Sequence, residues 1–347
     1  MIRVLFYLSS GLFLGWSLGA NDSANIFGTA VGTGMIKFKQ AAVIVGVFVI
    51  FGAVASGAGA SHNLGSLGAI TTLPGAFTVA LAAATSVFLM TSLGLPVSTS
   101  QAIVGSIIGW NIFAGIETDA ALMTKFVSTW FLCPVLAAGF AAVIYNLLKF
   151  IINKYKIHLL ELDHYNRIAL ILVGAFGAYS LGANNIANVM GVFTKAISFP
   201  SLEAGPLQFD STQQLFFLGG LAIAVGAFTY SKKVMMTVGK DIFKISPVSA
   251  FVAVSSHSLV LFLFASRRLK NLLEGYGLPS FPLIPVSSSQ AIVGAIIGIG
   301  LVRGARNIRF KVLRDIVMSW ILTPLIAAVI SNISLFIMQN VFLQVVT

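Results

Sequence analysis

The chain is poor in charge: only 9% of its 347 residues are Asp, Glu, Lys or Arg, and ten of them are acidic. A soluble domain usually carries about 25% charged residues, so this composition excludes an ordinary water-soluble protein. Hydrophobic residues make up 57% of the chain, and apolar runs of roughly 17 to 25 residues, long enough to cross the hydrocarbon core as helices, recur along it. We therefore predict an all-α polytopic protein of the cell membrane.

Cysteine and cofactor motifs are also scarce. The single cysteine, Cys133, excludes an intramolecular disulfide and a cysteine-based metal site. The sequence has no glycine-rich nucleotide loop and no Ser, His and Asp set that would indicate hydrolysis. We expect no cofactor, and an enzyme is the least favoured class. His62 and His257 are isolated in or near apolar runs. We expect structural roles for both, and a proton shuttle is the alternative.

The formal net charge is +11, which on a soluble chain would suggest nucleic-acid binding. Here the basic residues gather in short segments between apolar runs, as Lys149, Lys154 and Lys156 do. Such clusters set the orientation of membrane helices by the positive-inside rule. The expected surroundings are therefore a lipid bilayer, with no nucleic-acid partner.

Two motifs occur twice in the chain. Leu18 to Asn25 reads LGANDSAN and Leu181 to Asn188 reads LGANNIAN, with six of eight positions identical. Pro96 to Gly109 reads PVSTSQAIVGSIIG and Pro285 to Gly298 reads PVSSSQAIVGAIIG, with twelve of fourteen identical. Because both motifs recur in the same order, we interpret the chain as a tandem duplication.

This duplication divides the chain into a first transmembrane repeat, 1–152, a short polar connector, 153–167, and a second transmembrane repeat, 168–347. Duplicated halves with matching broken helices are typical of secondary transporters, whose substrate sites lie near the membrane midplane where the repeats meet. The sequence therefore favours a transporter with a central site.

The polar motifs are expected to interrupt helices. The run 3–19 should end at the first Asn motif, and 168–181 and 184–197 should lie on either side of the second. The runs 101–115 and 285–302 should be re-entrant or discontinuous helices that begin at the Pro-Val-Ser steps. We read 3–19 as a retained membrane helix, because signal cleavage at its end would remove the motif.

The Asn motifs predict a cation site. Asp22 is the only carboxylate among apolar neighbours, and a charge at mid-helix costs from about 2.5 kcal/mol upward, so such residues usually have a function. Oxygen ligands with a single carboxylate suit sodium better than zinc or copper. A proton relay through Asp22 is the alternative. The candidate sodium ligands are Asp22, Asn25, Asn185 and Asn188, with Asn21 and Asn184 as additional candidates.

The Pro-Val-Ser motifs predict an anion site. Proline starts a helix well, and the first turn leaves unpaired N–H groups and the positive end of the helix dipole directed at an anion. Simple capping would need one hydroxyl, whereas each motif has three in a row. The candidate anion ligands are Ser98, Thr99, Ser100 and Gln101 in the first half and Ser287, Ser288, Ser289 and Gln290 in the second.

The two sites are linked by charge, because none of the motifs contains Lys or Arg. A dianion beside Asp22 would leave uncompensated negative charge in a low-dielectric interior, so cations must enter with it. Two alternatives stay open. A passive anion channel would use the same helix ends, and sulfate or another oxyanion would fit the hydroxyl groups nearly as well as phosphate.

The doubled GANDSAN and PVSTSQ motifs resemble those of the PiT family of inorganic phosphate transporters, and the resemblance covers essentially the whole chain. It implies inverted repeats, phosphate bound by the Ser-rich helix starts, cations held by the Asn motifs, import by cotransport with sodium or protons, and a homodimer. The chain departs from many relatives in having Asn185 in place of Asp, and Gln101 and Gln290 in place of His. Fewer titratable groups favour sodium as the cosubstrate.

Overall fold

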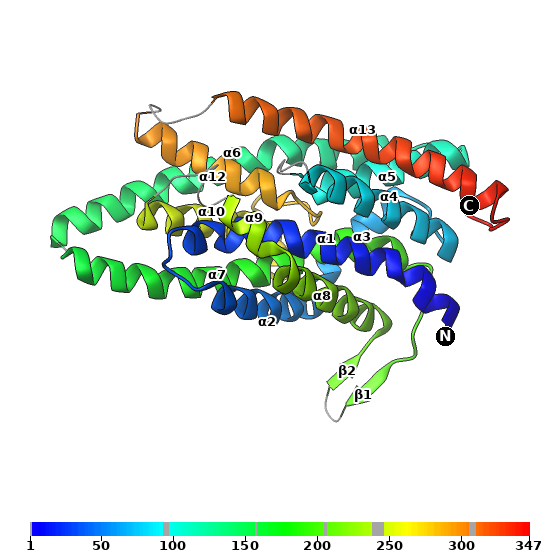
Figure 1. Cartoon of the computed structure of the whole chain (residues 1–347), viewed down its shortest axis with the longest axis horizontal. Helices are drawn as coiled ribbons and strands as arrows, with labels where there is room; N and C mark the ends of the chain where they lie inside the picture. Colours follow the sequence, from blue (N-terminus) through cyan, green and yellow to red (C-terminus); the bar gives the residue numbers. More distant parts are fainter. Residues whose placement is uncertain (1, 93–96, 157, 205–206, 238–245, 305–309) are drawn as a thin grey trace.

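The protein is described by a computed structural model that covers residues 2–92, 97–156, 158–204, 207–237, 246–304 and 310–347. Long helices lie side by side along its longest axis (Figure 1). The described elements are α1 (Ile2–Gly32), α2 (Phe38–Ser56), α3 (Ala58–Leu67), α4 (Leu73–Ser92), α5 (Thr99–Ala114), α6 (Ala120–Tyr155), α7 (Leu159–Met190), the 3-10 turn η1 (Gly191–Phe193), β1 (Leu202–Ala204), β2 (Leu207–Phe209), α8 (Ser211–Thr229), α9 (Ser231–Thr237), α10 (Pro247–Leu263), α11 (Arg267–Gly275), α12 (Ser288–Val302) and α13 (Phe310–Asn340).

Seven of the described helices, α1, α2, α4, α6, α7, α8 and α13, are long and apolar enough to cross a membrane. α10 and α11, bent by 71° at their junction, form an eighth span if they are counted as one. Large apolar side chains point outward on α6, where Phe131 is 72% exposed, as lipid-facing residues do. The all-helical, multi-pass architecture predicted from the sequence is confirmed.

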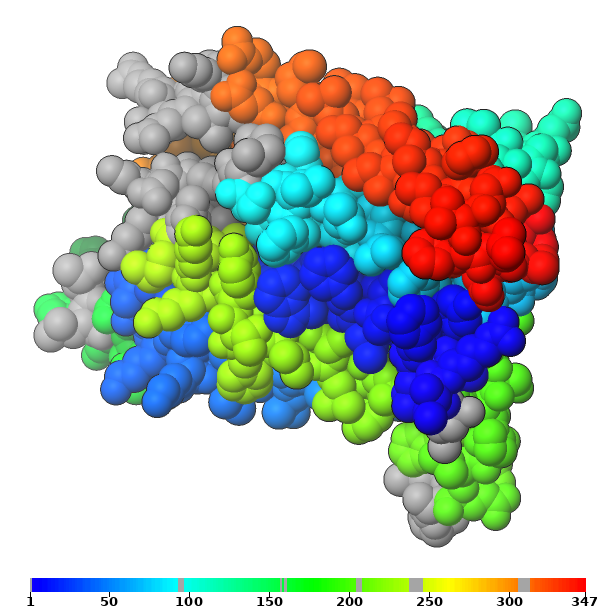
Figure 2. Space-filling model, turned by 45° about the vertical axis from the view of Figure 1, so that its right-hand side comes forward, coloured from blue at the N-terminus to red at the C-terminus, as the bar shows by residue number. Residues whose placement is uncertain are grey.

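The only strands in the described residues, β1 and β2, form an antiparallel hairpin in which Leu202 pairs with Phe209. The hairpin projects from the helical body at the lower right of Figure 2. It lies between α7 and α8 in the chain and contributes nothing to the buried motifs.

The two halves exchange their packing partners. In repeat order α1, α2, α4, α5 and α6 correspond to α7, α8, α10, α12 and α13. α2 packs on α7 while α8 packs on α1, and α5 packs on α13 while α12 packs on α6. Four of the largest helix interfaces therefore join one half to the other in equivalent pairs.

Two of these interfaces depend on glycine at equivalent positions. A Cβ atom added to Gly105 in α5 would lie 2.2 Å from the carbonyl oxygen of Pro324 in α13, and one added to Gly294 in α12 would lie 2.2 Å from that of Pro134 in α6. Small residues allow helix backbones in membranes to approach this closely. The two halves thus share local geometry as well as sequence.

Equivalent helices run in opposite directions. α1 leaves the N-terminus on the right of Figure 1 and runs to the left, whereas α7 starts on the left and runs to the right. α6 and α13 are opposed in the same way. The inverted arrangement that the family resemblance implies stays a prediction, and these directions support it.

The expected helix breaks at the Asn motifs are wrong. α1 continues through Asn21 to Asn25 and ends at Gly32, and α7 continues through Asn184 to Asn188, so the ends predicted at 19 and 181 do not exist. The backbone stays helical because the amide side chains find partners on other helices, which removes the cost of burying them.

Two other boundaries also differ. α6 extends to Tyr155 and α7 begins at Leu159, so most of the predicted polar connector 153–167 is helical. Polar residues there need not end a helix, because charged ends can project beyond the hydrocarbon into water. The second half's Ser-rich helix begins at Ser288 and not at Pro285. Pro96, the matching residue of the first half, lies outside the described residues.

Candidate functional site

The Ser-rich motifs form the first turns of α5 and α12. Ser98 accepts a hydrogen bond from the backbone N–H of Gln101 at 3.2 Å, and Ser287 accepts one from the N–H of Gln290 at 3.2 Å. These bonds are N-caps, and they leave the protons of the two hydroxyls free to be donated. The sequence pattern therefore gives the same local structure twice.

The two helix starts are joined to each other. Ser289 donates its hydroxyl to the carbonyl oxygen of Val97 at 2.7 Å, and Ser100, its equivalent, donates to that of Val286 at 3.0 Å. Each bond crosses from one half to the other. The positive ends of two helix dipoles consequently lie beside each other.

The Asn motifs reach the hydroxyls of the opposite half. Asn25 in α1 donates to Ser288 Oγ at 3.0 Å and to Ser289 Oγ at 3.5 Å. Asn188 in α7 donates to Ser100 Oγ at 2.8 Å. The Asn motifs and the Ser-rich motifs, which are far apart in the sequence, therefore form one site between the halves.

Asp22 and its equivalent, Asn185, lie in contact at the centre of this site. Asn185 donates to Asp22 Oδ2 at 3.3 Å, and Asn21 donates to Asp22 Oδ1 at 3.0 Å. If the halves are related by a local two-fold axis, as the inverted arrangement predicts, that axis passes between these two residues. Asp22 is 2% exposed, and neither ion pair of the described residues includes it. Among the described residues, its hydrogen-bond donors are these two side-chain amides.

Several oxygens at the site are buried without a hydrogen-bond partner among the described residues. A buried polar atom without a partner costs roughly 1 to 3 kcal/mol, so these oxygens are open to a hydrogen bond or a coordination bond from another group. Amide oxygens could hold a hard cation, and the Thr99 hydroxyl could donate to an anion. The oxygens are Thr99 Oγ1, Gln101 Oε1, Asn185 Oδ1, Asn188 Oδ1 and Gln290 Oε1.

Asn184 anchors the segment that leads into α12. Its amide donates to the carbonyl oxygen of Ile284 at 3.2 Å, and its oxygen accepts from the N–H of Val286 at 2.8 Å. Asn21, its equivalent, donates to the carbonyl oxygen of Val97 at 3.3 Å. These two additional candidates for sodium ligation therefore form hydrogen bonds with backbone groups, and Asn184 uses both of its polar side-chain atoms in these bonds.

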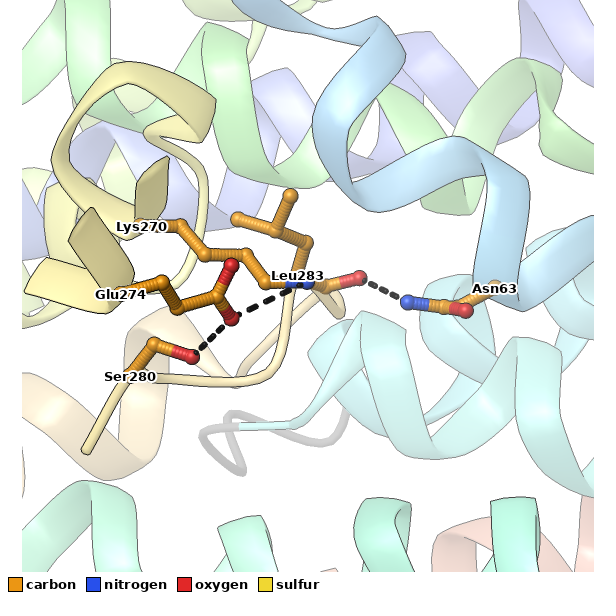
Figure 3. A network of polar contacts seen from close by, with 5 residues as sticks. All are labelled: Asn63, Lys270, Glu274, Ser280 and Leu283. Atoms are coloured by element: carbon orange, nitrogen blue, oxygen red, sulfur yellow. Dashed lines mark hydrogen bonds and ion pairs between the residues drawn. The ribbon is translucent and has the colours of Figure 1, made fainter. Parts of the chain in front are cut away.

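The same segment makes additional polar contacts at a greater distance from the site (Figure 3). Asn63 in α3 donates to the carbonyl oxygen of Leu283 at 2.7 Å. Ser280 donates to Glu274 in α11 at 2.6 Å, and Lys270 lies 3.7 Å from the same carboxylate. The segment that leads into α12 is thus hydrogen-bonded to α3 and to α11 as well as to α7.

The sequence patterns missed one residue of the site. His257 in α10 is buried, and its Nε2 lies 2.8 Å from Ser288 Oγ. A lone histidine carries no motif. The available signal was an asymmetry between the halves: the histidine lies among serines in Val254 to Ser258, whereas α4, the equivalent helix, has no histidine.

Comparison with known proteins identifies the family of the chain. Residues 18–331 match the model of the phosphate transporter family. A predicted phosphate permease of Methanocaldococcus jannaschii is 28% identical, covering 96% of this chain and 97% of its own. The sulfate permease CysP of Bacillus subtilis is 29% identical, covering 95% and 87%.

A solved structure of a sodium-dependent phosphate transporter has a similar fold, with a TM-score of 0.76 and 23% sequence identity, and the match covers 98% of this chain and 99% of that one. The family model spans most of the chain and both copies of each motif. The chain therefore belongs to the phosphate transporter family, as a multi-pass membrane transporter and not an enzyme.

Proposed function

We propose that the protein imports inorganic phosphate by cotransport with sodium, through alternating access to the site between its halves. The observation that carries the proposal is the meeting of two hydroxyl-rich helix starts with a single buried carboxylate and unpaired amide oxygens. One part of this arrangement suits an oxyanion and the other suits a hard cation.

The anion would be held by hydroxyl groups and helix dipoles. Ser98, Ser287 and Thr99 each keep a hydroxyl proton that no described acceptor takes. Helix N-termini bind phosphate through their unpaired N–H groups and their positive dipole ends. With two such ends side by side, the site can receive an anion without Lys or Arg.

Charge explains why the transport would be coupled. Two unit charges about 4 Å apart interact by about 4 kcal/mol at an effective dielectric constant of about 20. A phosphate dianion that close to Asp22 would meet a repulsion of about twice that size. A cation held between Asp22 and the oxygens of Asn185 and Asn188 removes this cost, so anion and cation favour each other's binding.

The donor set favours sodium over protons. Asn185 and Asn188 offer neutral oxygens that do not titrate, and hard monovalent and divalent cations prefer oxygen ligands. A proton-coupled cycle would have to use Asp22 or His257, the two titratable side chains that the described residues place at the site. The proton-coupled transporter therefore remains the second candidate for the coupling ion.

Phosphate is favoured over sulfate by the unpaired acceptors. Hydrogen phosphate carries a proton that needs an acceptor, whereas sulfate at neutral pH has none to donate. The buried oxygens of Gln101 and Gln290 have no described donor, and a protonated oxyanion could satisfy one of them. The sulfate permease among the relatives makes sulfate the competitor to test.

Burial of the site supports alternating access and opposes a passive channel. The eight anion-binding candidates are only 1% to 3% exposed, so solutes reach them only when elements move. The equivalent interfaces between the halves would let the site open in turn to each side of the membrane. The homodimer implied by the family resemblance is likewise a proposal, which the mass of the purified protein in lipid nanodiscs would test.

The deciding experiment measures uptake of labelled phosphate into proteoliposomes under an inward sodium gradient, under a proton gradient, and with excess sulfate. The expected result is accumulation driven by sodium and resistant to sulfate. Accumulation driven only by protons would reject sodium coupling, competition by sulfate would reject phosphate selectivity, and flux that never builds a gradient would indicate a channel.

A further inference from the structure

His257 contacts the proposed anion site through one serine. Its Nε2 lies 2.8 Å from Ser288 Oγ, and its side chain is fully buried in α10. Its other ring nitrogen, Nδ1, has no hydrogen-bond partner among the described residues. The histidine is thus held by a single polar contact, and that contact is to a candidate ligand.

The hydrogen bonds of Ser288 can be counted. A hydroxyl has one proton to donate and two lone pairs that accept. Asn25 donates to Ser288 Oγ at 3.0 Å and occupies one lone pair. His257 can either donate to the second lone pair of Ser288 Oγ or accept the Ser288 proton. Which of the two it does decides the direction of that proton.

Two tautomers of His257 are compatible with the contact. If Nε2 is bare, it takes the proton of Ser288, and Nδ1–H is left as a buried donor without a described acceptor. If Nε2 carries the proton, it donates to the second lone pair of Ser288, and Nδ1 is left as a bare acceptor. Buried N–H groups without partners are rarer than under-satisfied acceptors, so the second tautomer is favoured.

We propose that His257 is a positioning residue for oxyanion binding: its Nε2–H and the amide of Asn25 fill both lone pairs of Ser288, which turns the hydroxyl proton toward the anion. The inference rests on the proposed function, because it needs an oxyanion at the start of α12. It adds a residue that only one half possesses.

The asymmetry has a consequence for the site. Thr99 is the equivalent of Ser288, and its hydroxyl has no described partner, while the equivalent helix α4 contains no histidine. The hydroxyl of Thr99 is therefore free to rotate, whereas the orientation of the Ser288 hydroxyl is fixed by its two donors. The second half would contribute the more pre-organised donor to the anion.

The first test compares uptake kinetics of His257→Phe and His257→Gln in proteoliposomes. Loss of the donor should raise the KM for phosphate about five- to tenfold, the size of one hydrogen bond, with less than about a twofold change in maximal rate. Gln offers an N–H at similar reach and should stay within about twofold of wild type. Ser256→Ala is the matched control, because that buried hydroxyl bonds only to the carbonyl oxygen of Val252 in its own helix, at 2.8 Å.

The second test is a double-mutant cycle with Ser288→Ala. If the histidine acts through this serine, adding His257→Phe to Ser288→Ala should raise the KM by less than about twofold further. A full five- to tenfold effect in that background would overturn the proposal, as would an unchanged KM in His257→Phe alone. If the Phe variant does not purify as a monodisperse protein, His257→Met, which also lacks a donor, replaces it with the same expected shift.

The outcomes separate this inference from the proposed function. If wild-type protein accumulates no phosphate, the proposed function fails before any variant is compared. If wild type accumulates phosphate and His257→Phe behaves as Ser256→Ala does, the transport proposal stands and the role of His257 is rejected.

Discussion

Removing the charge of Asp22 should abolish cation-dependent uptake. In Asp22→Asn the cation would lose an attraction of about 4 kcal/mol, taken at about 4 Å and an effective dielectric constant of about 20, which is about a thousandfold in affinity. The protein should still fold, since the amide is isosteric and can still accept from Asn21 or Asn185, which now donate to Asp22 at 3.0 and 3.3 Å.

The symmetry of the site offers a rescue. Because Asp22 and Asn185 are equivalent and in contact, the double variant Asp22→Asn with Asn185→Asp moves the carboxylate to the other side of the local axis and restores one acid beside one amide. We expect sodium-driven phosphate uptake in the double variant to recover at least tenfold over Asp22→Asn.

The assay is the initial rate of phosphate uptake against sodium concentration, with thermal unfolding of each purified variant as the folding control. Normal sodium dependence in folded Asp22→Asn would refute the role of the carboxylate in coupling. Failure of the folded double variant to exceed the single one would show that the two sides of the axis are not interchangeable, and would reject a cation held between them.

Two further predictions concern the contacts between the halves. Ser100→Ala and Ser289→Ala each remove one of the equivalent hydrogen bonds between the halves. Each should lower the free energy of unfolding by about 1 kcal/mol and raise the KM for phosphate. If neither quantity changes in either variant, these serines do not join the halves at the anion site. Gly105→Ala and Gly294→Ala should each destabilise the fold by about 1 to 3 kcal/mol, read as a lower unfolding midpoint, because the added Cβ would lie 2.2 Å from a carbonyl oxygen. Gly139→Ala, whose Cβ would have no neighbour within 4 Å, is the control and should leave the midpoint unchanged.

Local patterns predicted the Ser-rich helix starts well. A proline, a row of hydroxyls and a following apolar run define a capped helix by short-range chemistry, and Ser98 and Ser287 cap the helices as their positions indicate. Repetition in the sequence also predicted that the two halves would contribute equivalent elements. The first inference uses only neighbouring residues, and the second needs only a comparison of two segments of the same sequence.

The continuity of α1 and α7 could not be predicted in this way. A hydropathy argument treats Asn21, Asp22 and Asn25 as costly in a membrane helix, but the cost depends on partners that come from other elements. Asn25 meets Ser288 and Asp22 meets Asn185, across 263 and 163 residues of chain. Those pairings exist only after the halves assemble, and the same holds for the contact of His257 with Ser288.

The exchange of packing partners bears on how such a chain could arise. In a single unduplicated half, the surface of α2 that now lies on α7 and the surface of α5 that now lies on α13 would have no cover of their own. Two copies of that half could cover each other, so the contacts now made within one chain could first have been made between two. Fusion of two such copies into one chain would remove the requirement that they be identical. A single acid at Asp22 and a single histidine at His257 are differences that a pair of identical subunits could not hold.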